Sequence, residues 1–269
     1  MIDQFQAWLL ALVQGLTEFL PVSSSAHLLI PSQIFGWPDQ GLDFDIAVHF
    51  GTLMAVIAYY RKDLLMMTQG TIEGIKLRKM NPELDQVLLL GLATLPAVIV
   101  GLIAKDWIEL NLRSAWVVAA ATVGFGLLLG FADKKARQDK TDQSWGWRDS
   151  LLVGLAQVLA FIPGTSRSGI TITMALLLGY KRTAAANFSF LMSIPLILAA
   201  SLLMLLDMSQ STQSVDAALI IQATLISAIS AYLCIAAFIK LVDRIGMMPF
   251  VIYRLLLGGF LAWWLWTAG

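Results

Sequence analysis

The chain has 269 residues, of which 58% are hydrophobic and 13% are charged, and its formal net charge is zero. Soluble domains carry roughly twice that share of charged residues, and the mean hydropathy here is +0.75. This composition excludes an ordinary soluble domain, and the zero net charge indicates no nucleic-acid partner. The chain is predicted to be an all-α membrane protein that crosses the bilayer several times.

The first apolar segment, 5–36, is interrupted at its centre by the stretch FLPVSSSAH, Phe19 to His27. The apolar runs on either side have roughly 12 to 16 residues, fewer than the ~20 that a helix needs to cross a bilayer. Backbone that is not helical persists at membrane depth only where protein or trapped water satisfies its polar groups. We therefore predict a re-entrant helical hairpin, which enters the membrane and returns to the same side.

Two polar residues precede this break on one helix face, because Gln14 and Glu18 are four residues apart. A charge at mid-bilayer costs about 3 kcal/mol, so Glu18 needs a partner or a water-filled cavity. Carboxylate and amide oxygens suit a hard cation such as Mg²⁺ or Ca²⁺. We predict that Glu18 and Gln14 hold a divalent metal, with capping or polar packing as the alternative.

The break itself contains Ser23, Ser24 and Ser25, with His27 close behind. One serine could cap the returning helix, but a cap needs only one hydroxyl. Hydroxyls and backbone N–H groups at a helix N-terminus form an anion site. His27 lies one turn into the helix, where an imidazole can exchange a proton with a hydroxyl or a leaving oxygen.

Six further apolar segments are uninterrupted and are predicted to be transmembrane helices: about 44–60, 86–104, 114–132, 186–206, 217–239 and 248–267. Two of them contain an ionisable residue whose role the sequence leaves open. His49 suits either packing or the lining of a site. Arg254 suits either pairing with carbonyls at a helix end or a contribution to a site.

Between these segments, the apolar stretch 149–180 is interrupted by FIPGTSRSG, Phe161 to Gly169. A second re-entrant hairpin is predicted here. Thr165, Ser166 and Ser168 offer hydroxyls, and Arg167 offers a planar fork of donors that suits phosphate. The alternative is a purely structural ion pair between Arg167 and Glu18. Acid, serines, histidine and arginine brought together indicate phosphate chemistry.

The two breaks align with each other when the sequence is shifted by 142 residues. The shift places Phe19 on Phe161, Pro21 on Pro163, and Ser25 on Arg167. We predict an inverted-topology repeat with halves at about 1–132 and 149–269, joined by a cytoplasmic loop at 133–148. Inverted repeats of this kind place broken helices face to face, and ligand sites form between them.

Basic residues gather in the loops at 61–85 and 133–148, which hold five lysines and arginines each. The positive-inside rule therefore predicts that these loops are cytoplasmic. Both termini are then expected on the outer side of the membrane. The first hairpin is expected to enter from outside, and the second from the cytoplasm.

These motifs resemble the undecaprenyl-diphosphatase family, also called bacitracin-resistance proteins, over essentially the whole chain. The first motif is Gln14-x-x-x-Glu18 followed by Pro-Val-Ser-Ser and His27. The second, Pro-Gly-x-Ser-Arg-Ser-Gly-x-Thr, begins at Pro163 without a departure. Many members of the family carry glutamate where this chain has Gln14.

The resemblance implies a membrane phosphatase that hydrolyses undecaprenyl diphosphate, a polyprenyl diphosphate lipid, to the monophosphate and phosphate. This recycles the lipid carrier of peptidoglycan synthesis and confers bacitracin resistance. The resemblance also implies six membrane spans with two hairpins, a divalent-metal cofactor and a homodimer. A bacterial inner-membrane location, with periplasmic termini and a site that faces the periplasm, is expected.

For the reaction, Ser24 is the predicted nucleophile, with His27 as its base or as the acid for the leaving group. Attack by His27 itself and direct attack by water remain alternatives. Arg167 and a metal on Glu18 would neutralise the diphosphate. A rival function is a secondary transporter or flippase of a lipid phosphate or another anion, because inverted repeats with broken helices are typical of transporters.

Overall fold

The computed structural model describes residues 2–38, 40–112, 114–208 and 217–268. These residues form eleven α-helices and two short 3₁₀ turns without a β-sheet, which confirms the all-α class. The elements are α1 (Gln4–Thr17), α2 (Ser24–Ile34), α3 (Leu42–Tyr59), α4 (Arg61–Leu77), α5 (Pro82–Asn111), α6 (Ala115–Lys135), η1 (Asp142–Ser144), α7 (Trp147–Val158), η2 (Leu159–Phe161), α8 (Arg167–Leu177), α9 (Arg182–Met208), α10 (Ala217–Ile245) and α11 (Met248–Ala268).

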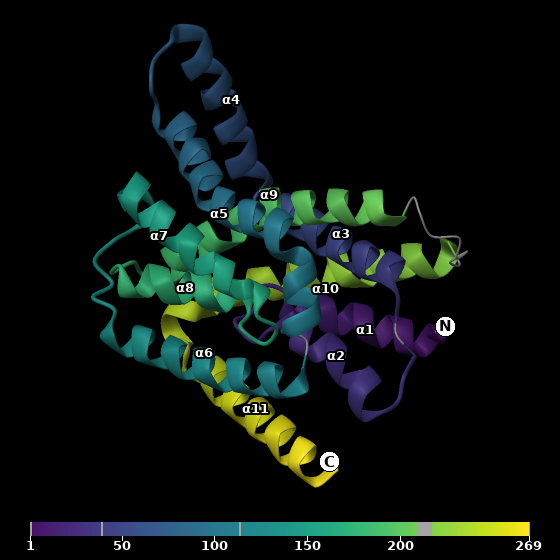
Figure 1. Cartoon of the computed structure of the whole chain (residues 1–269). Coiled ribbons are helices and arrows are strands. Elements are labelled where there is room, and N and C mark those ends of the chain that lie inside the picture. Colours follow the sequence, from purple (N-terminus) through teal and green to yellow (C-terminus); the bar gives the residue numbers. More distant parts are fainter. Residues whose placement is uncertain (1, 39, 113, 209–216, 269) are drawn as a thin grey trace.

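Six of these helices are long and apolar enough to cross a membrane, at the six places predicted from the sequence. The candidate spans are Leu42–Tyr59, Pro82–Ala104, Ala115–Lys135, Arg182–Leu202, Ala217–Ile245 and Met248–Thr267. The segment 61–85 is more ordered than the predicted loop, because it contains α4 and the start of α5. Asn81 caps α5 by accepting from the Leu84 N–H, and Pro82 occupies the first turn, where a proline fits. Figure 1 shows this helix pair projecting from the bundle.

Each interrupted segment is a helix, a break and a second helix, as predicted. Tyr180, just after α8, donates a hydrogen bond to Asp149 at the start of α7, with 2.9 Å between the oxygens. The α7–α8 hairpin therefore returns to the end of the bundle where it begins. The α1–α2 hairpin begins at the opposite end, where Trp8 Nε1 donates to Gln222 near the start of α10. That the two hairpins re-enter a membrane stays a prediction.

Equivalent helices of the two halves make equivalent contacts with the opposite half. Helix α1 packs against α10, and its counterpart α7 packs against α5. Helix α3 contacts α10, and its counterpart α9 contacts α5. Helix α6 packs on both α8 and α11, which lies beside it in Figure 1. These reciprocal contacts are expected of two halves related by a two-fold axis. The inverted division at 1–132 and 149–269 stays a prediction.

The structure corrects the shift that relates the two breaks from 142 to 143 residues. Helices α2 and α8 begin at Ser24 and Arg167, and each follows a serine with a positive φ, 73° at Ser23 and 71° at Ser166. The second break has one residue more between its proline and its helix, which the alignment of the prolines does not reveal. Arg167 therefore corresponds to Ser24, and not to Ser25 as predicted.

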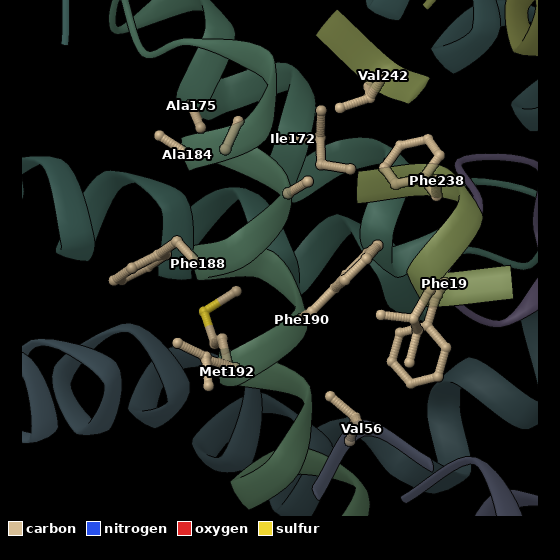
Figure 2. Packing of buried hydrophobic residues seen from close by; sticks show 14 of the residues in the cluster. Phe19, Val56, Ile172, Ala175, Ala184, Phe188, Phe190, Met192, Phe238 and Val242 are labelled. Carbon is tan, nitrogen blue, oxygen red and sulfur yellow. The ribbon is translucent and has the colours of Figure 1, made fainter. Parts of the chain in front are cut away.

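The apolar core lies around α9 and is built from both halves. Phe190 packs against Phe19 of the first break, with ring centroids 5.1 Å apart, and against Phe238 of α10 at 5.7 Å. Figure 2 shows Phe190 between these two rings, with Ile172 of α8 nearby. The first break is thus anchored to the core by Phe19, the residue directly after Glu18.

Polar contacts gather at one end of the bundle, and we call this the basic end. Arg182 Nε donates to Asp133 at 2.6 Å, and the N–H of Met247 donates to the same carboxylate at 3.2 Å. Lys140 Nζ lies 2.8 Å from Asp149. The segments around 133–149, 180–183 and 243–247 therefore share one end, as the distribution of lysine and arginine predicts. The two terminal residues, expected on the outer side, lie outside the described residues.

Candidate active site

Glu18 lies where the first residues of α2 and α8 meet. Ser24 Oγ donates to its Oε2 at 2.8 Å, and Arg167 Nη2 donates to its Oε1 at 3.2 Å. Gln14 Nε2 also donates to Oε2, at 3.1 Å. Only 9% of Glu18 is exposed. A hydroxyl, an amide and a guanidinium therefore stabilise a buried carboxylate.

Arg167 is held in place by three groups, which fix its guanidinium beside the carboxylate. Nη1 donates to the backbone carbonyl of Ser189 at 3.0 Å, while Nη2 reaches Glu18. The Phe19 ring lies 5.9 Å from the guanidinium carbon, within reach of a cation–π contact. The structure thus contains the Arg167–Glu18 pair that the sequence offered as one of its alternatives.

A cavity of about 220 Å³ opens beside this pair. The polar residues that line it are Glu18, Ser23, Ser24, Ser25, His49, Gln157, Ser166, Arg167 and Ser201. The apolar residues that line it are Ala97, Ala160, Phe161, Leu196, Ile197 and Ala200. Residues from both breaks therefore face one space. The apolar residues come from α5, α9 and the second break, and the polar residues come from both breaks and from α3, α7 and α9.

The predicted phosphate-binding hydroxyls fall into two groups. Ser23, Ser25 and Ser166 line the cavity together with Ser24. Thr165 and Ser168 are fully buried and do not belong to its lining. Ser168 Oγ instead donates to the Leu20 carbonyl at 2.9 Å, and so ties the second break to the first.

Within the described residues, the His27 imidazole makes two hydrogen bonds, and neither is with Ser24. Nδ1 lies 2.7 Å from the Ser23 carbonyl, which can only accept, so Nδ1 carries the hydrogen. Nε2 then accepts from the Tyr253 hydroxyl at 2.5 Å. In this structure the hydrogen-bond acceptor of the Ser24 hydroxyl is Glu18, and the base role expected of His27 stays a prediction.

His49 belongs to the site, which resolves one question that the sequence left open. Its Nδ1 contacts the Asp45 carbonyl at 2.7 Å, which fixes the ring, and its Nε2 lies 4.0 Å from Glu18 Oε2. The ring also lines the cavity. His49 therefore places a second titratable group beside the carboxylate.

Arg254 resolves the other question, because it binds backbone carbonyls of both breaks. It is fully buried in α11. Its three nitrogens donate to five carbonyls at 2.8–3.4 Å, those of Pro21, Gly164, Thr165, Ala121 and Thr122. Non-helical backbone at depth needs such partners, and the sequence signal for this role was an arginine in the middle of an apolar span.

Gly164 of the second break allows close backbone packing. Gly164 has a φ of +94°, which only glycine adopts without strain. A Cβ on Gly164 would also lie 2.4 Å from the Val118 carbonyl oxygen of α6. The break therefore fits tightly against α6, and this fit places the carbonyls that Arg254 binds.

Comparison with known proteins adds to this geometry. The family model described as bacitracin resistance protein BacA matches residues 7–260. This chain belongs to that family. A relative from Alcanivorax borkumensis, named undecaprenyl-diphosphatase, is 54% identical over 264 residues, which cover 98% of this chain and all of the relative. The BacA family match spans both breaks and every residue that meets Glu18.

In this BacA family member, the predicted metal ligands contact each other but form only a small set. Among the described residues, no group of three or more His, Cys, Asp and Glu side chains is placed to hold a metal. Gln14 is fully buried, and its Oε1 has no hydrogen-bond partner in the described part of the chain. This unpaired amide oxygen beside a carboxylate suits Mg²⁺ or Ca²⁺, which prefer oxygen ligands.

Proposed function

We propose that this protein hydrolyses undecaprenyl diphosphate to undecaprenyl phosphate and inorganic phosphate. This activity recycles the lipid carrier of peptidoglycan synthesis and confers resistance to bacitracin. One observation carries the proposal within this family. A serine hydroxyl, which is hydrogen-bonded to a buried carboxylate, lines the same cavity as an arginine and several apolar side chains. A lipid diphosphate has the matching parts, namely an anionic head and an apolar tail.

Ser24 is the nucleophile in this proposal. Its Oγ forms a bond to the terminal phosphorus as the bridging P–O bond breaks, and lipid monophosphate leaves. Glu18, 2.8 Å away, takes the hydroxyl proton. Water then attacks the phosphoserine, phosphate leaves, and Ser24 regains the proton from Glu18. Arg167 stabilises the charge on the transferring phosphoryl group.

A divalent metal, Mg²⁺ or Ca²⁺, is the proposed cofactor, and Glu18 and Gln14 are its proposed ligands. When bound, the ion would neutralise part of the diphosphate charge. With one carboxylate and one amide, this pair provides less negative charge than two glutamates would.

The membrane setting is the second part of the proposal. The six apolar helices place the protein in a membrane as a multi-pass protein. We propose the bacterial inner membrane, with periplasmic termini, a site that faces the periplasm and a homodimeric state. Both hairpins are re-entrant in this proposal, so the two breaks meet within the bilayer while the lipid tail stays between spans.

Release of inorganic phosphate from undecaprenyl diphosphate by purified protein in detergent tests the activity. Detergent removes any gradient, so a secondary transporter or flippase would release none. The phospho-enzyme identifies the nucleophile. A phosphoserine that survives acid and disappears in Ser24→Ala supports the proposed step. An acid-labile adduct lost in His27→Ala would instead identify histidine as the nucleophile.

A further inference from the structure

Gln157 is a buried polar side chain in α7 that the reaction described above does not use. Only 1% of it is exposed, and it lines the cavity that Glu18, Ser24 and Arg167 also line. Neither its Nε2 nor its Oε1 has a hydrogen-bond partner among the described residues. A buried amide without partners costs free energy, so its position at the cavity needs a reason.

Close helix packing fixes Gln157 in this place. Gly154, one turn earlier in α7, lies against α5, where a Cβ on Gly154 would come within 2.4 Å of the Ala93 carbonyl oxygen. Ala97 of α5, one turn beyond Ala93, lines the cavity together with Gln157. Close packing of α7 against α5 at Gly154 therefore holds the amide of Gln157 at the cavity.

The repeat explains why Gln157 is unpaired. The shift of 143 residues that relates Ser23 to Ser166 also relates the start of α1 at Gln4 to the start of α7 at Trp147. The prolines depart from this shift, because the second segment has one residue fewer before its proline and one residue more after it. Gln157 therefore corresponds to Gln14, whose Nε2 donates to Glu18. The residues 142 and 143 positions after Glu18 are Ala160 and Phe161, and neither carries a carboxylate. The second half thus retains the amide but has no carboxylate for it.

We infer that Gln157 binds the terminal phosphate of the lipid diphosphate, with its Nε2 donating to a non-bridging phosphate oxygen. This inference rests on the proposed function. Arg167 already donates to Glu18 and to the Ser189 carbonyl, so it cannot satisfy every phosphate oxygen alone. A neutral amide adds a donor without adding a second positive charge at this depth.

The test compares Gln157→Leu with Ser150→Ala in purified full-length protein. Leucine keeps the size of the side chain and removes the amide. Ser150 is a matched control, because it is fully buried in α7 with an unpaired hydroxyl and does not line the cavity. We expect Gln157→Leu to lower kcat/KM about tenfold or more, since a hydrogen bond to a charged group is lost. The Kd of inorganic pyrophosphate, measured by titration calorimetry, should rise by a similar factor, and Ser150→Ala should change neither value.

Three outcomes would overturn the inference. An unchanged kcat/KM and pyrophosphate Kd in Gln157→Leu would show that the amide does not touch phosphate. A lower kcat/KM with a lower thermal midpoint and an unchanged pyrophosphate Kd would make Gln157 a packing residue. A change in Mg²⁺ dependence with unchanged pyrophosphate binding would make it a metal ligand. If the wild-type protein binds pyrophosphate but releases no phosphate from undecaprenyl diphosphate, the proposed function fails, while the binding comparison still decides the role of Gln157.

Discussion

The two helix breaks have a similar backbone conformation but different side chains at the first position of the following helix. In each, a serine with positive φ precedes the helix, and its hydroxyl pairs with the serine two residues later, at 3.1 Å for Ser23–Ser25 and 3.2 Å for Ser166–Ser168. The next position is Ser24 in the first break and Arg167 in the second. Both of these side chains bind Glu18.

This difference shows how a symmetric fold can make an asymmetric site. Two identical breaks would offer two hydroxyls or two cations at the start of α2 and α8. With one of each, the carboxylate of Glu18 holds a hydroxyl on one oxygen and a cation on the other. In the proposed reaction, the cation neutralises the phosphate that the hydroxyl attacks.

The largest effect is expected from removal of the cation. Arg167→Ala should lower the rate of phosphate release by about 10²- to 10³-fold, because the charge that develops on the phosphoryl group is no longer stabilised. Glu18→Ala should be equally harmful, since Ser24 loses its proton acceptor. Phosphate release by detergent-purified variants measures both effects, and the elution profile in size-exclusion chromatography shows whether each variant is folded. Normal turnover by folded Arg167→Ala would contradict the site assignment.

A second arginine extends the comparison, because Arg254 is fully buried and donates only to backbone carbonyls. Arg254→Met should lower the free energy of unfolding by about 3 kcal/mol, since five buried carbonyls in and near both breaks lose their donor. Arg167→Ala should lower the thermal midpoint less, because the Glu18 carboxylate keeps its hydrogen bonds from Ser24 and Gln14 and borders the cavity, where water can reach it. Thermal denaturation in detergent compares the two. Equal loss of stability in both variants would mean that Arg167 also has a structural role.

A smaller change is expected when the first break gains a second acid. Gln14→Glu should tighten the binding of Mg²⁺ or Ca²⁺ roughly tenfold, because a carboxylate attracts a hard cation more strongly than an amide does. Titration calorimetry with the metal alone provides a readout that does not depend on turnover. Gln14→Leu is the matched variant and should weaken metal binding. If neither change alters the metal affinity, Gln14 is a packing residue that positions Glu18.

Much of the fold was predictable, because ~20-residue apolar runs and central polar breaks are direct consequences of the bilayer as a solvent. The convergence of Glu18, Ser24 and Arg167 was also predictable, since a buried charge needs a partner. The alignment of the breaks was wrong by one residue, because Pro21 and Pro163 match in sequence while the helices behind them begin one position apart. Backbone geometry, here the positive φ at Ser23 and Ser166, decides that register.

Three residues could not be assigned from sequence, for different reasons. Arg254 lies far from both breaks along the chain, and only the packing of α11 against α6 brings it to their carbonyls. Gln157 resembles any polar residue near the end of a helix until its burial and its missing partners are known. His49 was left open because one face of α3 meets the cavity, and helical periodicity alone does not say which.

The smallest expected effect separates the two caps. Ser166 Oγ accepts from the Gly169 N–H at 3.1 Å, whereas Ser23 makes no side-chain cap bond to α2. Ser166→Ala should therefore lower the free energy of unfolding by about 1 kcal/mol, and Ser23→Ala by about half of that or less. Both alanines keep the strain of a positive φ, so the difference isolates the cap. Glycine at either position relieves that strain and should raise stability by about 1 kcal/mol relative to alanine. Denaturant unfolding in mixed micelles measures all four variants, and an equal loss in the two alanine variants would show that the breaks are energetically alike.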